Sequence, residues 1–145
     1  MPDPILDVQN LSVTFPTKAG AVSAVKSVTF SLAAGETLSL VGESGSGKSV
    51  TSLALMGLLM SGTELSGEIW FRDPTSSDAQ PIDLLKLSRE ARRHYRGKLI
   101  SMIFQEPLTS LNPVYTCGEQ LIEALQLHQE LDRSAAKARA LELFA

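Results

Sequence analysis

The sequence has little cysteine, little excess of basic charge and no long hydrophobic run. Its single cysteine, Cys117, cannot form a disulfide within the chain, so nothing in the sequence requires an oxidising compartment. A formal net charge of -3 argues against a general nucleic-acid-binding protein. The most apolar run, 53–60, is far shorter than the roughly 20 residues of a membrane-spanning helix. Residues 1–7 contain two acids and no Lys or Arg, unlike a secretory signal. We therefore expect a soluble, cytoplasmic chain that reaches a membrane only through a protein partner.

The length of 145 residues fits one small domain or part of a larger one, and 43% hydrophobic residues can build a core. Apolar and alternating runs predict strands, of which the first two form an antiparallel hairpin, over 5–15, 28–32, 37–41, 68–71 and 99–104. Helical patterns predict helices over 48–59, 89–95, 118–129 and 134–144. Ser88 is the expected N-cap of the second helix.

One segment carries a specific chemistry. It matches the P-loop pattern Gly-x-x-x-x-Gly-Lys-Ser/Thr, between a predicted strand and a predicted helix, with Gly42, Glu43, Ser44, Gly45, Ser46, Gly47, Lys48 and Ser49. The glycines allow backbone angles at which successive N–H groups turn inward around an anion, and the helix N-terminus adds its positive dipole end. Lys48 is expected to reach the outer phosphates, and the hydroxyl of Ser49 to bind Mg²⁺. The segment predicts binding of the phosphates of ATP; the alternative is a Gly/Ser turn that happens to precede a helix.

A basic cluster before the last predicted strand could be interpreted as a site that binds nucleic acid or lipid. Its members are Arg89, Arg92, Arg93, Arg96 and Lys98, with His94 and Tyr95 among them. Because the cluster is short and the chain is acidic overall, a solvated helix face is the favoured interpretation. His94 and His128 have no second ligand at metal-binding spacing, so both are interpreted as surface residues.

Three segments make the sequence resemble the ATP-binding subunits of ABC transporters. Residues 41–49 resemble the Walker A motif in the form in which that family has it. Residues 102–107, Met-Ile-Phe-Gln-Glu-Pro, resemble its Q-loop. Residues 108–113, Leu-Thr-Ser-Leu-Asn-Pro, followed by Gly-Glu-Gln at 118–120, are similar to the branch that serves dipeptide, oligopeptide and glutathione importers. The resemblance covers 5–145. It implies an α/β P-loop nucleotide-binding domain with an N-terminal antiparallel β part, an incomplete parallel core sheet and the start of a helical subdomain.

The resemblance also implies site residues outside the glycine loop. Phe15 falls near the aromatic position that stacks on adenine, although many relatives have tyrosine there. An aromatic residue at a strand end is also a common core residue, and both roles stay open. Gln105 is similar to the residue that contacts Mg²⁺ and the attacking water and senses the membrane subunit; with Lys48 it would form the catalytic set. The alternative for Gln105 is a backbone contact within its loop.

The partners follow from the same resemblance. The surface from Glu106 to Gln120 resembles the one that receives the membrane-spanning permease subunits. A second ATP-binding subunit would pair with this one as a homodimer or heterodimer, an extracytoplasmic solute-binding protein would act indirectly, and no nucleic acid is expected. The implied location is peripheral, on the cytoplasmic face of the inner membrane. The implied function is to power import of peptides or related small solutes by ATP hydrolysis.

Several motifs that the family uses for hydrolysis do not occur in the printed residues. We find no Leu-Ser-Gly-Gly-Gln type signature, no apolar strand ending in Asp-Glu (the Walker B motif) and no switch histidine after it. Residues 1–145 are therefore expected to be the N-terminal portion of one nucleotide-binding domain, poorly stable and without ATP turnover alone. Two other interpretations remain: a soluble non-transport P-loop protein of a regulatory, DNA-repair or translation type, and a fragment with no activity.

Overall fold

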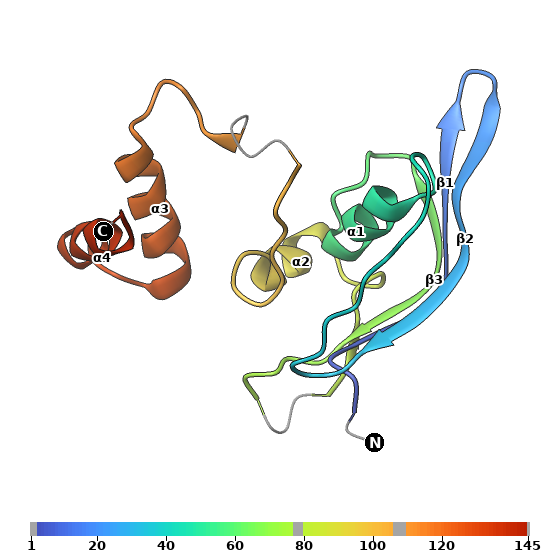
Figure 1. The fold of residues 1–145 in the computed structure, drawn as a ribbon, viewed down its shortest axis with the longest axis horizontal. Coiled ribbons are helices and arrows are strands. Elements are labelled where there is room, and N and C mark those ends of the chain that lie inside the picture. The colour runs from blue at the N-terminus through green and yellow to red at the C-terminus, as the bar shows by residue number, and fades with distance from the viewer. Residues whose placement is uncertain (1–2, 77–79, 106–109, 145) are drawn as a thin grey trace. The chain divides into compact units, whose positions relative to one another are not determined.

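The computed structural model describes residues 3–76, 80–105 and 110–144. The chain divides into two compact units, Met1–Ile100 and Ser101–Ala145, and each is described by itself. The first unit contains a sheet with two short helices, and the second contains a pair of helices (Figure 1). No helix among the described residues is long and apolar enough to cross a membrane.

The first unit is built on an antiparallel sheet with strand order β2-β1-β3-β4. Its strands are β1 (Leu6–Thr17), β2 (Gly20–Leu32), β3 (Glu64–Phe71) and the short β4 (Ile82–Asp83). The predicted hairpin is confirmed: β1 and β2 pair from Leu6 with Leu32 to Thr17 with Gly20. The second strand begins eight residues earlier than predicted, because irregular pairing interrupts the alternation on which the prediction relied.

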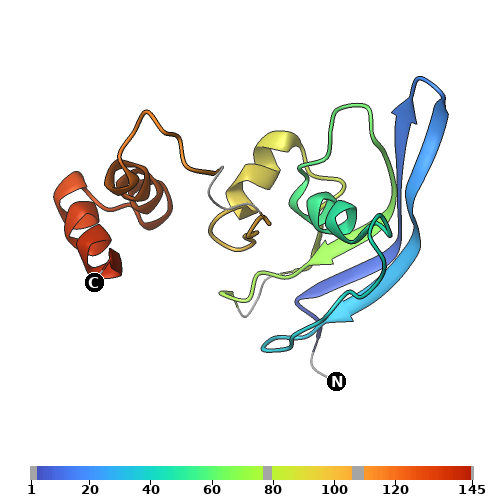
Figure 2. The same cartoon turned by 45° about the horizontal axis from the view of Figure 1, so that its top comes forward.

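The core of this unit lies between the sheet and α1 (Lys48–Met56), which packs against one face of the curved strands (Figures 1 and 2). Its fully buried members are Val8, Leu11 and Val13 of β1 and Ile69 of β3, joined by Ala54 of α1 and other apolar side chains. Burying a Val, Leu or Ile side chain contributes about 1.5–3 kcal/mol. This packing fixes where α1 begins, and α1 begins at the glycine loop.

The helix α1 ends at Met56 rather than at the predicted residue 59. Gly57 adopts a left-handed conformation with a φ of 62°, and its N–H donates to the carbonyl of Ala54 while the N–H of Leu58 donates to that of Leu53. Such a left-handed C-cap satisfies the last carbonyls and stops the helix. The predicted second helix is confirmed as α2 (Arg89–Tyr95), where the side chain of Ser88 accepts a hydrogen bond from the N–H of Ala91.

Two predicted strands are absent from the described residues. Residues 37–41 and 99–104 form no strand, and Val41 is 94% exposed; only an isolated parallel bridge joins Arg96 to Ile100. Their composition is strand-like, but a strand needs a neighbouring strand with which its N–H and C=O groups form hydrogen bonds. Neither segment has such a neighbour in the described part of the chain, so the parallel part of the predicted sheet is not formed there.

The prediction that the basic cluster is a solvated helix face is confirmed for Arg89 and Arg93, which are exposed on α2, and wrong for Arg92 and Arg96, which are half-buried; Lys98 is exposed but lies beyond the end of the helix. The guanidinium of Arg92 is half-buried and donates to the carbonyl of Leu85 at 2.8 Å. Burial, and secondarily the charge of Arg96, lower the pKa of Arg92, which nevertheless stays charged at neutral pH. Arg92 therefore fastens α2 to the segment that follows β4.

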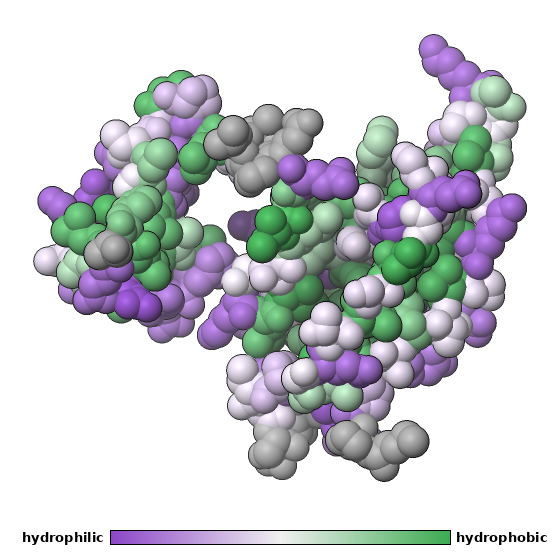
Figure 3. Space-filling view, viewed as in Figure 1, coloured by the Kyte–Doolittle hydropathy of each residue, from purple (hydrophilic) through white to green (hydrophobic). Residues whose placement is uncertain are grey.

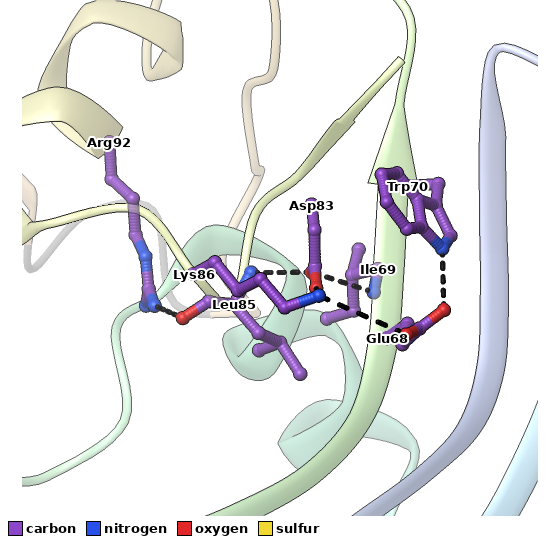
Figure 4. Close-up of polar contacts among 7 residues, drawn as sticks. All are labelled: Glu68, Ile69, Trp70, Asp83, Leu85, Lys86 and Arg92. Carbon is purple, nitrogen blue, oxygen red and sulfur yellow. Dashed lines mark hydrogen bonds and ion pairs between the residues drawn. The ribbon is translucent and has the colours of Figure 1, made fainter.

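The segment after β4 is itself held by a buried carboxylate (Figure 4). Asp83 is 6% exposed and accepts hydrogen bonds from the N–H groups of Ile69 at 3.2 Å and Leu85 at 3.0 Å. Lys86 pairs with Asp83 at 3.2 Å and lies over the ring of Trp70. Because a buried charge is tolerated only when it is paired and hydrogen-bonded, these contacts fix the short strand β4 against β3.

The second unit consists of α3 (Cys117–Gln129) and α4 (Arg133–Phe144), which confirm the last two predicted helices. A capping box starts α3: the side chain of Thr116 accepts from the N–H of Glu119, and the carboxylate of Glu119 accepts from the N–H of Thr116. The two helices bury only a small core of Leu125, Ala136 and Ala140. Hydrophobic side chains therefore remain on the surface of this unit (Figure 3).

Candidate functional site

The predicted P-loop forms a compact turn at the start of α1. The N–H of Ser46 donates to the carbonyl of Glu43 at 3.2 Å, and Gly45 and Gly47 have φ angles of 81° and 92°. Such positive angles are rare for residues with a side chain, which explains why glycine occupies both positions. In such glycine turns, consecutive backbone N–H groups can turn toward an anion.

Two glycines of the loop also allow close approach. A Cβ on Gly42 would lie 2.6 Å from the hydroxyl oxygen of Ser46, and one on Gly47 would lie 2.5 Å from the carbonyl oxygen of Ala24 and 3.1 Å from Val25. Gly47 therefore lets the start of α1 rest directly on the backbone of β2. This contact holds the loop at a fixed place against the sheet.

The ammonium of Lys48 is held over the loop. Its Nζ donates to the carbonyl oxygens of Gly42 and Glu43, each at 2.7 Å, and lies 3.3 Å from the hydroxyl oxygen of Ser46. These three contacts orient a positive charge at the loop before any anion binds. An orientation fixed in advance lowers the cost of ordering the side chain on binding.

The beginning of α1 is suited to an anion. Its N-cap, Gly47, offers no side chain to the first N–H groups, and the first turn contains no acidic residue. Thr51 is buried and donates its hydroxyl to the carbonyl of Gly47 at 3.0 Å, which secures the first turn. Ser49 is exposed in that turn and can offer an oxygen ligand to Mg²⁺. The residues present therefore fit a magnesium-bound phosphate group.

A hollow lies in front of the loop. It is lined by residues of the loop and by residues 23–26 and 28 of β2. The sequence did not indicate that β2 contributes to this hollow, because residues 23–28 neither match a motif nor alternate regularly. Ser23, Lys26 and the buried Thr51 are the polar members that the motif alone did not indicate.

The two site residues predicted outside the loop lie as follows. Phe15 is half-buried near the end of β1, pairs with Val22 and packs against the core, and it is not among the residues that line the hollow. Gln105 is exposed in a bend of the second unit, whose placement relative to the loop is not described. The loop residues 42–49 therefore form one site in the first unit, and the roles of Phe15 and Gln105 remain predictions.

The predicted permease-binding surface lies only partly in the described residues. Residues 106–109 are outside them. Over 110–120, the side-chain amide of Gln120 donates to the carbonyls of Asn112 at 3.0 Å and Tyr115 at 3.2 Å, and its oxygen accepts from the N–H of Asn112. Gln120 thus ties the irregular segment before α3 to the helix. Val114 and Tyr115 on this segment are largely exposed.

Comparison with curated proteins identifies relatives whose amino-acid sequences are similar to this chain along nearly its whole length. The chain is 48% identical over 141 residues to the glutathione import ATP-binding protein GsiA of Pectobacterium atrosepticum, covering 96% of this chain and 22% of that protein. It is 46% identical to the oligopeptide transport ATP-binding protein OppD of Haemophilus influenzae and to the dipeptide transport ATP-binding protein DppD of Bacillus subtilis, covering 97% of this chain and 41% and 40% of those proteins. The chain thus spans less than half the length of these relatives.

Comparison with solved structures and families agrees on the fold. The dimeric ATP-binding cassette MJ0796, solved in a post-hydrolysis state with ADP and Pi, matches with a TM-score of 0.74 and 24% identity, covering 94% of this chain and 54% of that one. The family model described as ABC transporter matches residues 25–144, which include the glycine loop, α1 and both helices of the second unit. The chain therefore belongs to the ABC transporter family, as one of its ATP-binding proteins, with the nucleotide-binding fold of that family.

Proposed function

We propose that residues 1–145 are the N-terminal portion of one nucleotide-binding domain, in the ATP-binding component of an importer for peptides or related small solutes. The observation that carries the proposal is the glycine loop, with Lys48 oriented over it and an uncapped helix start beneath. Support for the solute class comes from the relatives that are 46–48% identical, which are named for the import or transport of glutathione, oligopeptides and dipeptides. The same similarity favours transport over a soluble, non-transport ATP-binding role.

In the proposed site the loop N–H groups and Lys48 would hold the β- and γ-phosphates of ATP, and the hydroxyl of Ser49 and the amide of Gln105 would be ligands of Mg²⁺. The metal, when bound, neutralises phosphate charge. Lys48 supports charge on the phosphates, and Gln105 orients the attacking water by donating and accepting hydrogen bonds. Phe15 supplies a stacking face for adenine.

The proposed partners are membrane-spanning permease subunits at residues 106–120 and a second ATP-binding subunit, as a homodimer or heterodimer. The exposed Val114 and Tyr115, on a segment braced by Gln120, support a preformed contact surface. A solute-binding protein on the other side of the membrane would act through the permease. The proposed location is peripheral, on the cytoplasmic face of the inner membrane.

A chimera tests this function. We expect the 145-residue chain alone to release no phosphate from ATP above the buffer rate, because the printed residues contain no Asp-Glu Walker B motif to act on water and metal. Placed in the Haemophilus influenzae OppD in exchange for the 141 aligned residues, the chain should support ATP hydrolysis and oligopeptide uptake. Phosphate release and uptake of a labelled peptide measure both.

The matched control is the same chimera with Lys48→Ala, which should be made in equal amount and support neither activity. Two outcomes would contradict the proposal. One is Mg²⁺-dependent turnover by the isolated chain that Lys48→Ala abolishes. The other is a chimera that reaches the membrane fraction in normal amount, yet shows neither hydrolysis nor uptake.

A further inference from the structure

A second lysine faces the same hollow as Lys48. Lys26 of β2 lines the hollow together with the loop, it is exposed, and its ammonium makes no hydrogen bond or ion pair with the residues that the structure describes. Two ammonium groups that line one hollow can both contact an anion bound in it. The P-loop motif does not include Lys26, so its place in this hollow has to be explained by the structure of β2.

An irregularity of the backbone determines the position of Lys26. Val25 pairs with Val13 and Val28 pairs with Leu11, so that two residues of β2, Lys26 and Ser27, lie opposite one residue of β1. Val25 and Val28 are three apart and both pack against the core, whereas an unbroken strand would place them on opposite faces. The bulge reconciles these positions and leaves Lys26 at the hollow. Bulges commonly occur next to active sites, where they redirect a side chain.

The bulge is held by polar contacts despite an unfavourable backbone angle. Ser27 has a φ of 49°, which residues with a side chain rarely adopt. Its N–H donates to the hydroxyl oxygen of Ser12 at 2.9 Å, and its hydroxyl donates to the side-chain oxygen of Asn10 at 3.3 Å. A strained residue that its surroundings hold in place is more often found at functional sites than elsewhere.

We propose that Lys26 is a second phosphate-binding cation of this site, contacting the phosphate chain of a nucleoside diphosphate or triphosphate held by the loop. The inference rests on the proposed binding of ATP and adds a residue to it. The loop provides backbone N–H groups and Lys48. The bulge on β2 adds Lys26 to the lining of the same hollow, so that both ammonium groups contact the bound anion.

The test is a graded charge series at Lys26, measured as the equilibrium affinity of the 145-residue chain for Mg-ATP. Lys26→Arg should bind within about twofold of the unchanged chain, Lys26→Gln about five- to tenfold more weakly and Lys26→Glu more weakly still. Lys18→Gln is the matched control: Lys18 is exposed in the hairpin turn, does not line the hollow, and its loss changes net charge equally. Circular dichroism checks that each variant is folded.

The outcomes separate this inference from the function on which it rests. If the unchanged chain binds Mg-ATP, Lys48→Ala loses binding and the Lys26 series matches Lys18→Gln, the second-cation proposal is wrong and the nucleotide site stands. If the unchanged chain does not bind, both are overturned. If Lys26→Gln is unfolded, the Mg-ATP affinities of Lys26→Arg and Lys26→Glu are compared instead. Equal affinities of these two variants would contradict the proposal.

Discussion

Gly47→Ala should reduce the affinity of the chain for Mg-ATP by more than about a hundredfold. Alanine would have to adopt a φ of 92°, at a cost of about 1–2 kcal/mol, and its Cβ would lie 2.5 Å from the carbonyl oxygen of Ala24. Ala24 lies in β2 between Ser23 and Val25, which pair with Thr14 and Val13 of β1, so moving it would disturb the β1–β2 ladder. The loop would instead lift from β2, and the N–H groups that converge on the phosphate would separate. Isothermal titration with Mg-ATP measures this loss.

The matched control for Gly47→Ala is Gly45→Ala. Gly45 has a similar φ of 81°, but a Cβ there would meet nothing within 4 Å. This variant should retain the contact between the loop and β2 and lose roughly tenfold in affinity, the equivalent of its backbone strain. Equal losses in the two variants would show that the contact with Ala24 has no part in forming the site.

Gly67→Ala should produce the largest loss of stability of any single glycine substitution in the sheet. Gly67 lies in β3 with a φ of 98°, and a Cβ there would lie 2.5 Å from the carbonyl oxygen of Gln9 and 2.6 Å from that of Asn10. Both neighbours are backbone atoms of the central strand β1, so neither can rotate away. Backbone strain and overpacking together should lower the free energy of unfolding by about 2–5 kcal/mol. Urea denaturation followed by circular dichroism measures it.

Gly62→Ala is the matched control for Gly67→Ala, because it introduces the same kind of backbone strain without overpacking. Gly62 has a φ of 87° and a Cβ there would meet only Pro16, at an ordinary contact distance of 3.8 Å. Its substitution should lower the free energy of unfolding by only about 1–2 kcal/mol, with an unchanged denaturant slope. A Gly67→Ala variant no less stable than Gly62→Ala would contradict the close approach of β3 to β1.

The elements that the sequence predicted correctly are those whose causes are local. The β1–β2 hairpin follows from alternation and a turn, and α2 starts directly after its predicted capping residue Ser88. The glycine loop was predictable because its backbone angles require glycine at 45 and 47, whatever the rest of the chain does. Its family assignment is confirmed by the comparisons.

The features that the sequence did not predict depend on contacts between distant residues. Residues 37–41 are strand-like in composition, but a strand also needs a partner, which local pattern cannot provide. Arg92 was interpreted as exposed because its sequence neighbours are charged. In the structure its guanidinium is half-buried and donates a hydrogen bond to the carbonyl of Leu85. Lys26 gave no signal, since its position arises from a bulge defined by the pairing of β2 with β1. Such placements require the three-dimensional structure.

The central claim is that the loop at 42–49 binds the phosphates of ATP through Lys48 and the start of α1. Equilibrium dialysis of Mg-ATP against the purified 145-residue chain, with Lys48→Ala beside it, tests the claim most directly. We expect saturable binding by the unchanged chain and a loss of about a hundredfold or more in the variant, which lacks both the charge and its contacts to Gly42 and Glu43. Equal binding by the two proteins, or none by the folded unchanged chain, would contradict it.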